Sequence, residues 1–87
     1  MDSNLIPLEV DLHGRHPDDI PDVVDYWIDH AIKTNHRTIH LIHGRGTGAL
    51  RDMVRLHLTD HEFVDSFGDG GVLRGGGGVT VAVLRCE

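Results

Sequence analysis

The sequence has very little cysteine and few aromatic residues. Its 87 residues include one cysteine, Cys86, and 5% aromatic residues. A single thiol excludes a disulfide framework and any cysteine-rich zinc or iron–sulfur site, so we expect a reducing, cytoplasmic location. No apolar run is long enough to span a membrane. The N-terminus also lacks the basic and apolar segments of a signal peptide.

The chain is too short for most enzyme folds. A length of 87 residues permits one small domain with a thin core. This excludes a TIM barrel, a two-domain enzyme and a complete dinucleotide-binding fold. We therefore expect residues 1–87 to form a single domain and, because the chain begins with Met1, to be an intact small protein.

Positive charge is also scarce. The chain has 8 Lys and Arg against 14 Asp and Glu, a net charge of −6, which argues against a nucleic-acid partner. The distribution weakens that argument, because residues 37–56 hold four arginines and one acid. Arginine suits bidentate phosphate contact better than lysine does. One acidic helix in the first half of the chain explains the asymmetry equally well.

Hydrophobic periodicity predicts the secondary structure. Alternating apolar residues are typical of strands, and apolar residues three and four apart are typical of amphipathic helices. The predicted elements are strands at 8–13, 38–43, 62–67 and 79–85 and helices at 17–33 and 49–59. We expect Pro17 as the first helical residue, Thr47 as the N-cap of the second helix and Asn35 as a left-handed cap. The glycine-rich segment 68–78 is predicted to be a loop.

The element order β-α-β-α-β-β predicts an α/β fold of two layers. A four-stranded mixed sheet would carry two helices on one face. Right-handed crossovers make the first strands parallel, and the last strand returns as a hairpin partner. The other face of the sheet stays partly open, and we expect Glu9, Asp11 and His13 to lie on it or at its end.

Asp11 and His13 are the first candidates for chemistry. Their two-residue spacing places both on one face of the predicted strand. A carboxylate and an imidazole there can orient water, exchange a proton or share a metal. A solvated pair on a polar strand face is the alternative, and these residues alone favour it.

The second candidate is a glycine-rich turn between a strand and a helix, from His43 to Arg51. Glycines allow a close approach of the backbone to a ligand, and a helix N-terminus presents free N–H groups to an anion. The segment is not a Walker loop, because it lacks the terminal Lys-Ser/Thr. A simple tight turn is the alternative. The glycine run 75–78 is a third candidate. The favoured interpretation is a loose connecting loop that binds no ligand.

His57 and His61, four residues apart and followed by Glu62, resemble half of a metal site. The sequence places no further ligand clearly beside them. Histidines near a helix C-terminus are also favoured by the helix dipole. We prefer this second explanation on the sequence alone.

Three stretches together resemble the small MutS-related (Smr) domain family. Residues Val10 to Gly14 resemble its Leu-Asp-Leu-His-Gly motif, with Val for the first Leu. Residues His43 to Arg51 resemble its His-Gly-x-Gly-x-Gly motif with the following Leu-Arg. Residues Gly75 to Leu84 resemble its closing Gly-Gly-x-Gly-x-Thr-x-Val-x-Leu signature. The resemblance covers about residues 8–85.

The resemblance implies a fold like the C-terminal domain of a translation initiation factor and a role on nucleic acid. Similar domains nick or cleave DNA or RNA, some with a divalent metal, and some belong to DNA repair or recombination proteins. Asp11 and His13 become the catalytic candidates, and Asp11 the candidate ligand for Mg²⁺ or Mn²⁺. The residues expected to bind nucleic acid or its phosphate are His43, Gly44, Arg45, Gly46, Thr47, Gly48, Arg51, Gly77 and Gly78.

Three functions follow from these observations. The leading hypothesis is an endonuclease that acts on branched or nicked DNA, or on structured RNA. The second is a DNA- or RNA-binding module without catalysis that uses the same glycine loops. The third is a protein-interaction domain whose acidic helix face docks a basic partner. Because the chain is acidic, we expect a homodimer or a larger repair or processing assembly to supply basic surface.

Overall fold

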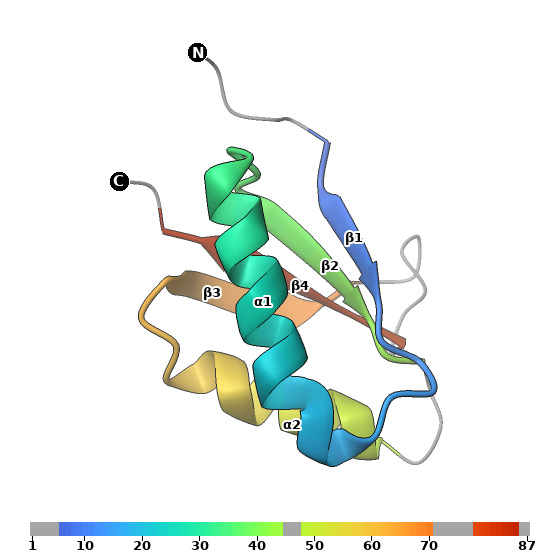
Figure 1. Cartoon of the computed structure of the whole chain (residues 1–87). Helices are drawn as coiled ribbons and strands as arrows, with labels where there is room; N and C mark the ends of the chain where they lie inside the picture. Colours follow the sequence, from blue (N-terminus) through green and yellow to red (C-terminus); the bar gives the residue numbers. More distant parts are fainter. Residues whose placement is uncertain (1–5, 45–47, 71–77, 86–87) are drawn as a thin grey trace.

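The predicted order of strands and helices is present in the computed structural model, which describes residues 6–44, 48–70 and 78–85. The elements are β1 (Leu8–Asp11), the 3-10 turn η1 (Pro17–Asp19), α1 (Ile20–Lys33), β2 (Thr38–Ile42), α2 (Ala49–Thr59), β3 (Val64–Asp69) and β4 (Val79–Leu84). Helix α2 has the predicted bounds. The mixed α/β architecture is therefore confirmed (Figure 1).

The four strands form one mixed sheet in the order β1-β2-β4-β3. β1 and β2 are parallel, whereas β4 is antiparallel to both β2 and β3. The parallel first pair and the final hairpin pairing are both as predicted. β4 lies between β2 and β3, so the last strand of the chain holds the two halves of the fold together. The carboxyl ends of β1 and β2 and the start of β4 consequently lie at the same end of the sheet.

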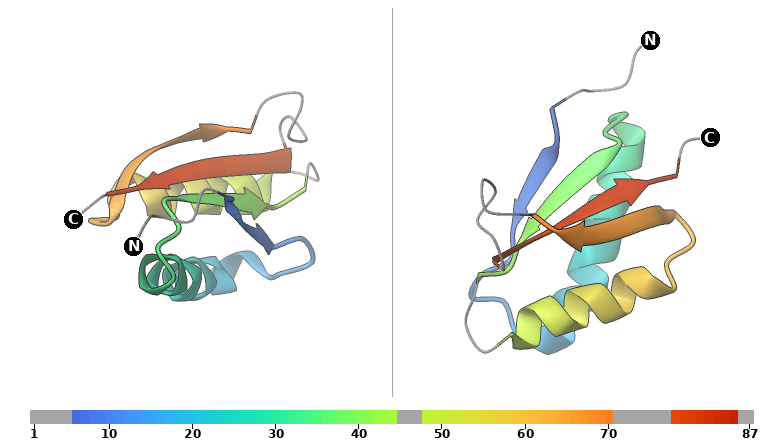
Figure 2. Two further views of the ribbon diagram at one scale, coloured as in Figure 1. Left: turned by 90° about the horizontal axis from the view of Figure 1, so that it is seen from above. Right: turned by 180° about the vertical axis from the view of Figure 1, so that it is seen from behind.

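One face of the sheet carries the hydrophobic core. Side chains that alternate along the strands meet buried side chains of the two helices on that face. The buried cluster includes Val10, Ile39, Leu41, Ala82 and Leu84 from the strands and Ile20, Val24, Ile28, Val54 and Leu58 from the helices. Seen from behind, the sheet lies before the helices, and no described helix covers that open face (Figure 2). The two-layer prediction is thus confirmed.

The first helix begins later than predicted. Pro17 opens the short turn η1, and the α-helix starts at Ile20. The reason is Pro21, which has no N–H to donate to the carbonyl of Pro17. The N–H of Ile20 donates to that carbonyl instead, which closes a tighter 3-10 turn. Ile32 continues the apolar spacing of this helix but is 39% exposed.

The end of the helix is as predicted. Asn35 has a φ of 63° and is the one described non-glycine residue with a positive φ. The N–H of His36 donates to the carbonyl of Ala31 at 2.8 Å, which completes a left-handed helix cap.

Strand ends differ from the predictions by one or two residues, and β3 differs more. It spans Val64–Asp69 rather than 62–67, because the N–H of Val64 donates to the carbonyl of His61 and closes a turn there. Gly68 and Asp69, predicted to be in a loop, pair with β4 instead. Segment 71–77 of that predicted loop lies outside the described residues. Within the described part of the chain, no helix is long and apolar enough to cross a membrane.

Candidate functional site

The sequence motifs meet at one end of the sheet. Past the carboxyl ends of the parallel strands β1 and β2, the N–H of Leu12 still donates to the carbonyl of Ile42 at 2.7 Å. The N–H groups of His43 and Gly44 both donate to the carbonyl of Gly78, each at 3.0 Å. Gly78 immediately precedes β4. Backbone hydrogen bonds therefore hold the three motifs together at this end of the sheet, where β1 and β2 end and β4 begins (Figure 1).

Asp11 and His13 form a close, solvent-exposed pair. Asp11 Oδ1 lies 2.8 Å from His13 Nδ1 and also accepts the backbone N–H of His13 at 3.0 Å. Their side chains are 59% and 75% exposed. The two hydrogen bonds from the His13 side chain and backbone lower the pKa of the Asp11 carboxyl below its ordinary value of 3.8. Asp11 is therefore ionised at neutral pH.

This contact fixes the orientation of the His13 ring. A carboxylate only accepts hydrogen bonds, so Nδ1 must carry the proton that faces Asp11. In the neutral imidazole, Nε2 then keeps a free lone pair. The arrangement is that of a general base held by a carboxylate.

A turn rather than the strand brings the pair together. β1 ends at Asp11, and the N–H of Arg15 donates to the carbonyl of Leu12 at 3.1 Å. Gly14 is the third residue of this turn and has a φ of +82°, a conformation that favours glycine. The prediction that both residues lie on the strand is therefore wrong for His13, which the turn carries back toward Asp11.

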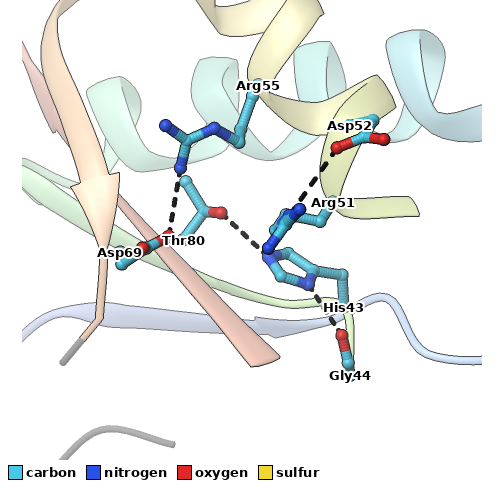
Figure 3. Close-up of polar contacts among 7 residues, drawn as sticks. All are labelled: His43, Gly44, Arg51, Asp52, Arg55, Asp69 and Thr80. Carbon is cyan, nitrogen blue, oxygen red and sulfur yellow. Dashed lines mark hydrogen bonds and ion pairs between the residues drawn. The ribbon is translucent and has the colours of Figure 1, made fainter. Parts of the chain in front are cut away.

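His43 is buried and fixed at both ring nitrogens. Its Nδ1 lies 3.0 Å from the carbonyl oxygen of Gly44, and its Nε2 lies 2.8 Å from Thr80 Oγ1 (Figure 3). A carbonyl accepts only, so Nδ1 donates and Nε2 accepts the hydroxyl proton of Thr80. His43 thus ties the end of β2 to β4. Its ring is not free to contact a ligand, so the geometry supports a positioning role.

Thr80 is the partner that the sequence did not single out as a site residue. It is completely buried in β4, within a run of β-branched residues that is typical of any strand. The only sequence feature that pointed to Thr80 was its position in the closing motif of the family. Its role became visible once β4 was placed beside β2.

The N-terminus of α2 opens onto the same end of the sheet. Gly48 is its N-cap, with a φ of +88° and no side-chain hydrogen bond. A terminal nitrogen of Arg51 lies 3.8 Å from the place where a Cβ of Gly48 would be. The Arg51 side chain therefore folds back over the first turn. Helix N–H groups and a guanidinium together favour an anion.

Arg55 and Asp69 form a second polar contact near this end, one that the sequence analysis did not single out. Arg55 Nη1 lies 3.0 Å from Asp69 Oδ1 (Figure 3). The guanidinium of Arg55 also lies 5.5 Å from the ring centre of Phe67. These contacts join α2 to β3 and hold the helix against the sheet.

Arg45, Gly46, Thr47 and Gly77 lie outside the described residues. The role of each stays a prediction. The described neighbour Gly44 has a φ of +77°, and a Cβ at this position would lie 3.9 Å from the Cβ of His13, so the glycine-rich turn begins beside the Asp11–His13 pair.

Asp11 is the one carboxylate of the Asp11–His13 pair, whereas Asp52 and Asp69 at this end are paired with Arg51 and Arg55. Asp11 has no third His, Cys, Asp or Glu ligand near it and His13 among the residues that the structure describes. Mg²⁺ is often held by one or two carboxylates together with substrate phosphates. The residues therefore fit Mg²⁺ or Mn²⁺ only through Asp11 and a bound phosphate.

Comparison with known proteins shows the family. The model of the Smr domain family matches residues 10–85. The chain belongs to the Smr domain family. The Smr domain of MutS2 from Thermus thermophilus has the same fold, with a TM-score of 0.88, 40% identity and coverage of 91% of this chain and 99% of that one. YdaL, a stand-alone small MutS-related protein from Escherichia coli, shares the fold with a TM-score of 0.82 at 23% identity, over 90% of this chain and 64% of its own.

Longer proteins contain Smr domains similar to this one. The chain is 40% identical over 82 residues to the endonuclease MutS2 of Staphylococcus carnosus, which covers 94% of the chain and 10% of that protein. It is 41% identical over 80 residues to the endonuclease MutS2 of Staphylococcus aureus, which covers 92% of the chain and 11% of that protein. The chain thus spans about a tenth of the length of these curated relatives.

Proposed function

We propose that this Smr domain is a nucleic-acid endonuclease that hydrolyses phosphodiester bonds in branched or nicked DNA, or in structured RNA. Its similarity to proteins named endonuclease MutS2 supports a nuclease-type module. The observation that carries the proposal is the exposed Asp11–His13 pair. The pair lies beside the glycine-rich turn that begins at Gly44, at the end of the sheet where α2 begins.

His13 is the proposed general base and acid. Its free Nε2 takes a proton from water as the water oxygen forms a bond to phosphorus. The bond from phosphorus to the leaving oxygen breaks, and that oxygen receives the proton that the His13 imidazolium gives up. Asp11 holds the ring in the required tautomer and stabilises the imidazolium.

Phosphate binding is assigned to the glycine-rich turn and α2. The N-terminus of α2 carries the positive end of the helix dipole, which favours an anion. Arg51 adds positive charge at this point and can stabilise charge that develops on the phosphate. We assign the same role to Arg45, Gly46, Thr47 and Gly77. When Mg²⁺ or Mn²⁺ is bound, Asp11 would hold it, and the ion would supply charge stabilisation at the phosphate.

A nicking assay on supercoiled plasmid and on labelled structured RNA tests the proposal. His13→Ala and Asp11→Asn are compared with His30→Ala and Asp18→Asn, which change exposed residues outside the Asp11–His13 pair. We expect His13→Ala to lower the rate by about 10²–10⁴-fold, the usual contribution of a general base. Parallel reactions with Mg²⁺, Mn²⁺ and EDTA test the metal. Equal cleavage by all five proteins would reject the proposed site.

A non-catalytic binding module is the second candidate. The observation that favours it is the hydrogen bond from the His13 backbone N–H to Asp11, because such a bond also stabilises a plain turn. In that case the protein binds nucleic acid without cleaving it, and His13→Ala binds as well as the wild type. Binding measured beside the nicking assay separates the two functions.

A further inference from the structure

Asp25, His57 and His61 form a cluster at the junction of the two helices. Asp25 Oδ1 lies 2.7 Å from His57 Nε2 and 3.0 Å from His61 Nε2. One ligand atom from each residue lies within 4.8 Å of the other two. His57 and His61 come from the end of α2 and the turn after it, whereas Asp25 is on α1. The fold therefore supplies the third ligand that the sequence did not reveal.

The cluster is accessible from solvent. It lies in an open pocket of about 420 Å³ lined by Asp25, His57, Asp60, His61 and Glu62. The side chains of His57 and His61 are 24% and 13% exposed, and that of Asp25 is 54% exposed. An ion could enter, and a water molecule could complete its coordination.

We propose that Asp25, His57 and His61 bind a transition-metal dication of the Zn²⁺ type. Two imidazoles and one carboxylate, with an open fourth position, are a ligand set that Zn²⁺ accepts. Mg²⁺ is disfavoured because it prefers oxygen ligands and octahedral geometry. Tetrahedral Zn²⁺ places its ligand atoms roughly 3.3 Å apart, so the distances of 2.7 and 3.0 Å from Asp25 Oδ1 to the two imidazole nitrogens need to lengthen by only a few tenths of an ångström.

Metal binding changes the protonation of His61 in a recognisable way. Without metal, each Nε2 faces a carboxylate oxygen and carries a proton. The Nδ1 of His61 accepts the backbone N–H of Phe63 at 3.1 Å. Binding through Nε2 moves the imidazole proton to Nδ1, so the hydrogen bond from Phe63 is lost. The amide of Phe63 is consequently a direct reporter of the metal-bound state.

This site is distinct from the proposed nuclease site. His57 lies near the C-terminal end of α2 and Gly48 caps its N-terminus, roughly 13 Å away along the helix axis. A bound ion would connect α1 to α2 and stabilise their packing, because a ligand that binds only the folded state raises its stability.

Isothermal titration calorimetry with Zn²⁺ and chelator-treated protein tests the site. The absorption spectrum of bound Co²⁺ reports whether the coordination is tetrahedral. A Cys86→Ser background without a histidine tag removes the single thiol and the tag as competing ligands. We expect one ion per chain and a shift of the Phe63 amide resonance. Asp25→Asn and His57→Ala should weaken the affinity at least tenfold. The matched variants Asp29→Asn and His30→Ala, which change exposed residues of α1 outside the cluster, should bind like the parent.

Three results would overturn the proposal. The first is no binding at about 100 μM Zn²⁺, far above the range of built zinc sites, by protein with native circular dichroism. The second is equal binding by Asp25→Asn, His57→Ala and their matched variants. The third is loss of binding in His13→Ala, which would place the ion at the other end of α2.

Discussion

The hydrogen bond between His43 and Thr80 offers the sharpest test of how the site is held. Thr80→Val replaces the hydroxyl with a methyl group of nearly the same shape, so it creates no cavity. It leaves His43 Nε2 without a donor in a position where His43 is 4% and Thr80 0% exposed. The ring cannot correct this by changing tautomer, because Nδ1 must keep its proton for the carbonyl of Gly44.

The expected cost follows from that burial. Leaving a buried acceptor unpaired destabilises a protein by about 1–3 kcal/mol. In a domain of this size each kcal/mol lowers Tm by about 4–8 °C. Replacing both partners, as in His43→Leu/Thr80→Val, removes the unpaired group. The double variant should therefore lose less stability than the sum of the two single variants, by about 1 kcal/mol.

Urea unfolding at neutral pH measures these differences. Trp27, the single tryptophan, packs partly buried against the core and reports unfolding by fluorescence. Thr80→Ser is the control, because it keeps the hydroxyl and loses one methyl group. The reasoning is refuted if Thr80→Val is as stable as the wild type, or if the two single variants add within about 0.5 kcal/mol.

Other predictions concern the turn, the helix N-terminus and Asp25. Gly14→Ala should destabilise the fold by about 1 kcal/mol in urea unfolding, because its φ of +82° strains an L-residue although its Cβ meets nothing. Arg51→Ala should lower the salt dependence of nucleic-acid binding by about one unit in log–log slope. Asp25 should stabilise the fold in a pH-dependent way. Partial burial raises the pKa of its carboxyl, but His57 and His61 together lower it below 3.8. Its ionised form therefore stabilises the fold above about pH 4, and this contribution is lost as the pH falls through the folded pKa. Asp25→Asn should consequently lose less stability than the wild type between about pH 5 and pH 2.

Each of these predictions has a control in the same chain. Gly68→Ala should leave stability nearly unchanged, because Gly68 has equal space but no positive φ. Arg37→Ala removes the same charge beside the start of β2, at the other end of the sheet. This variant should leave the salt dependence of nucleic-acid binding unchanged. Asp29→Asn is the control for Asp25→Asn, because it changes an exposed carboxyl of the same helix that contacts neither His57 nor His61 in an ion pair. If a variant and its control give the same result, the corresponding prediction is contradicted.

Local patterns were enough to predict the elements. The spacing of apolar residues predicted both helices. Asn35 predicted the end of α1, because few other residues adopt a positive φ. Pro21 shows the limit of such patterns. Its missing N–H is visible in the sequence, but the resulting 3-10 turn depends on which carbonyl the N–H of Ile20 finds.

The contacts within the sites could not be predicted as well. His43 and Thr80 are 37 residues apart, and Asp25 is 32 and 36 residues from His57 and His61. Residue spacing carries no information on such pairs until the strand order and the crossing of the helices are known. The Asp11–His13 pair is local, yet its contact depends on the turn at Gly14 rather than on strand alternation.

Backbone geometry explains why the motifs meet at one place. Parallel β1 and β2 end side by side, and β4 starts there because it runs antiparallel to β2. The turns that follow the two parallel strands contain Gly14 and Gly44, both with positive φ, and a Cβ at Gly44 would lie 3.9 Å from the Cβ of His13. The position of His13 therefore depends on both turns and on the anchoring of Gly44 by Gly78. A change in any of these backbone positions should disturb the proposed chemistry without removing a reacting group.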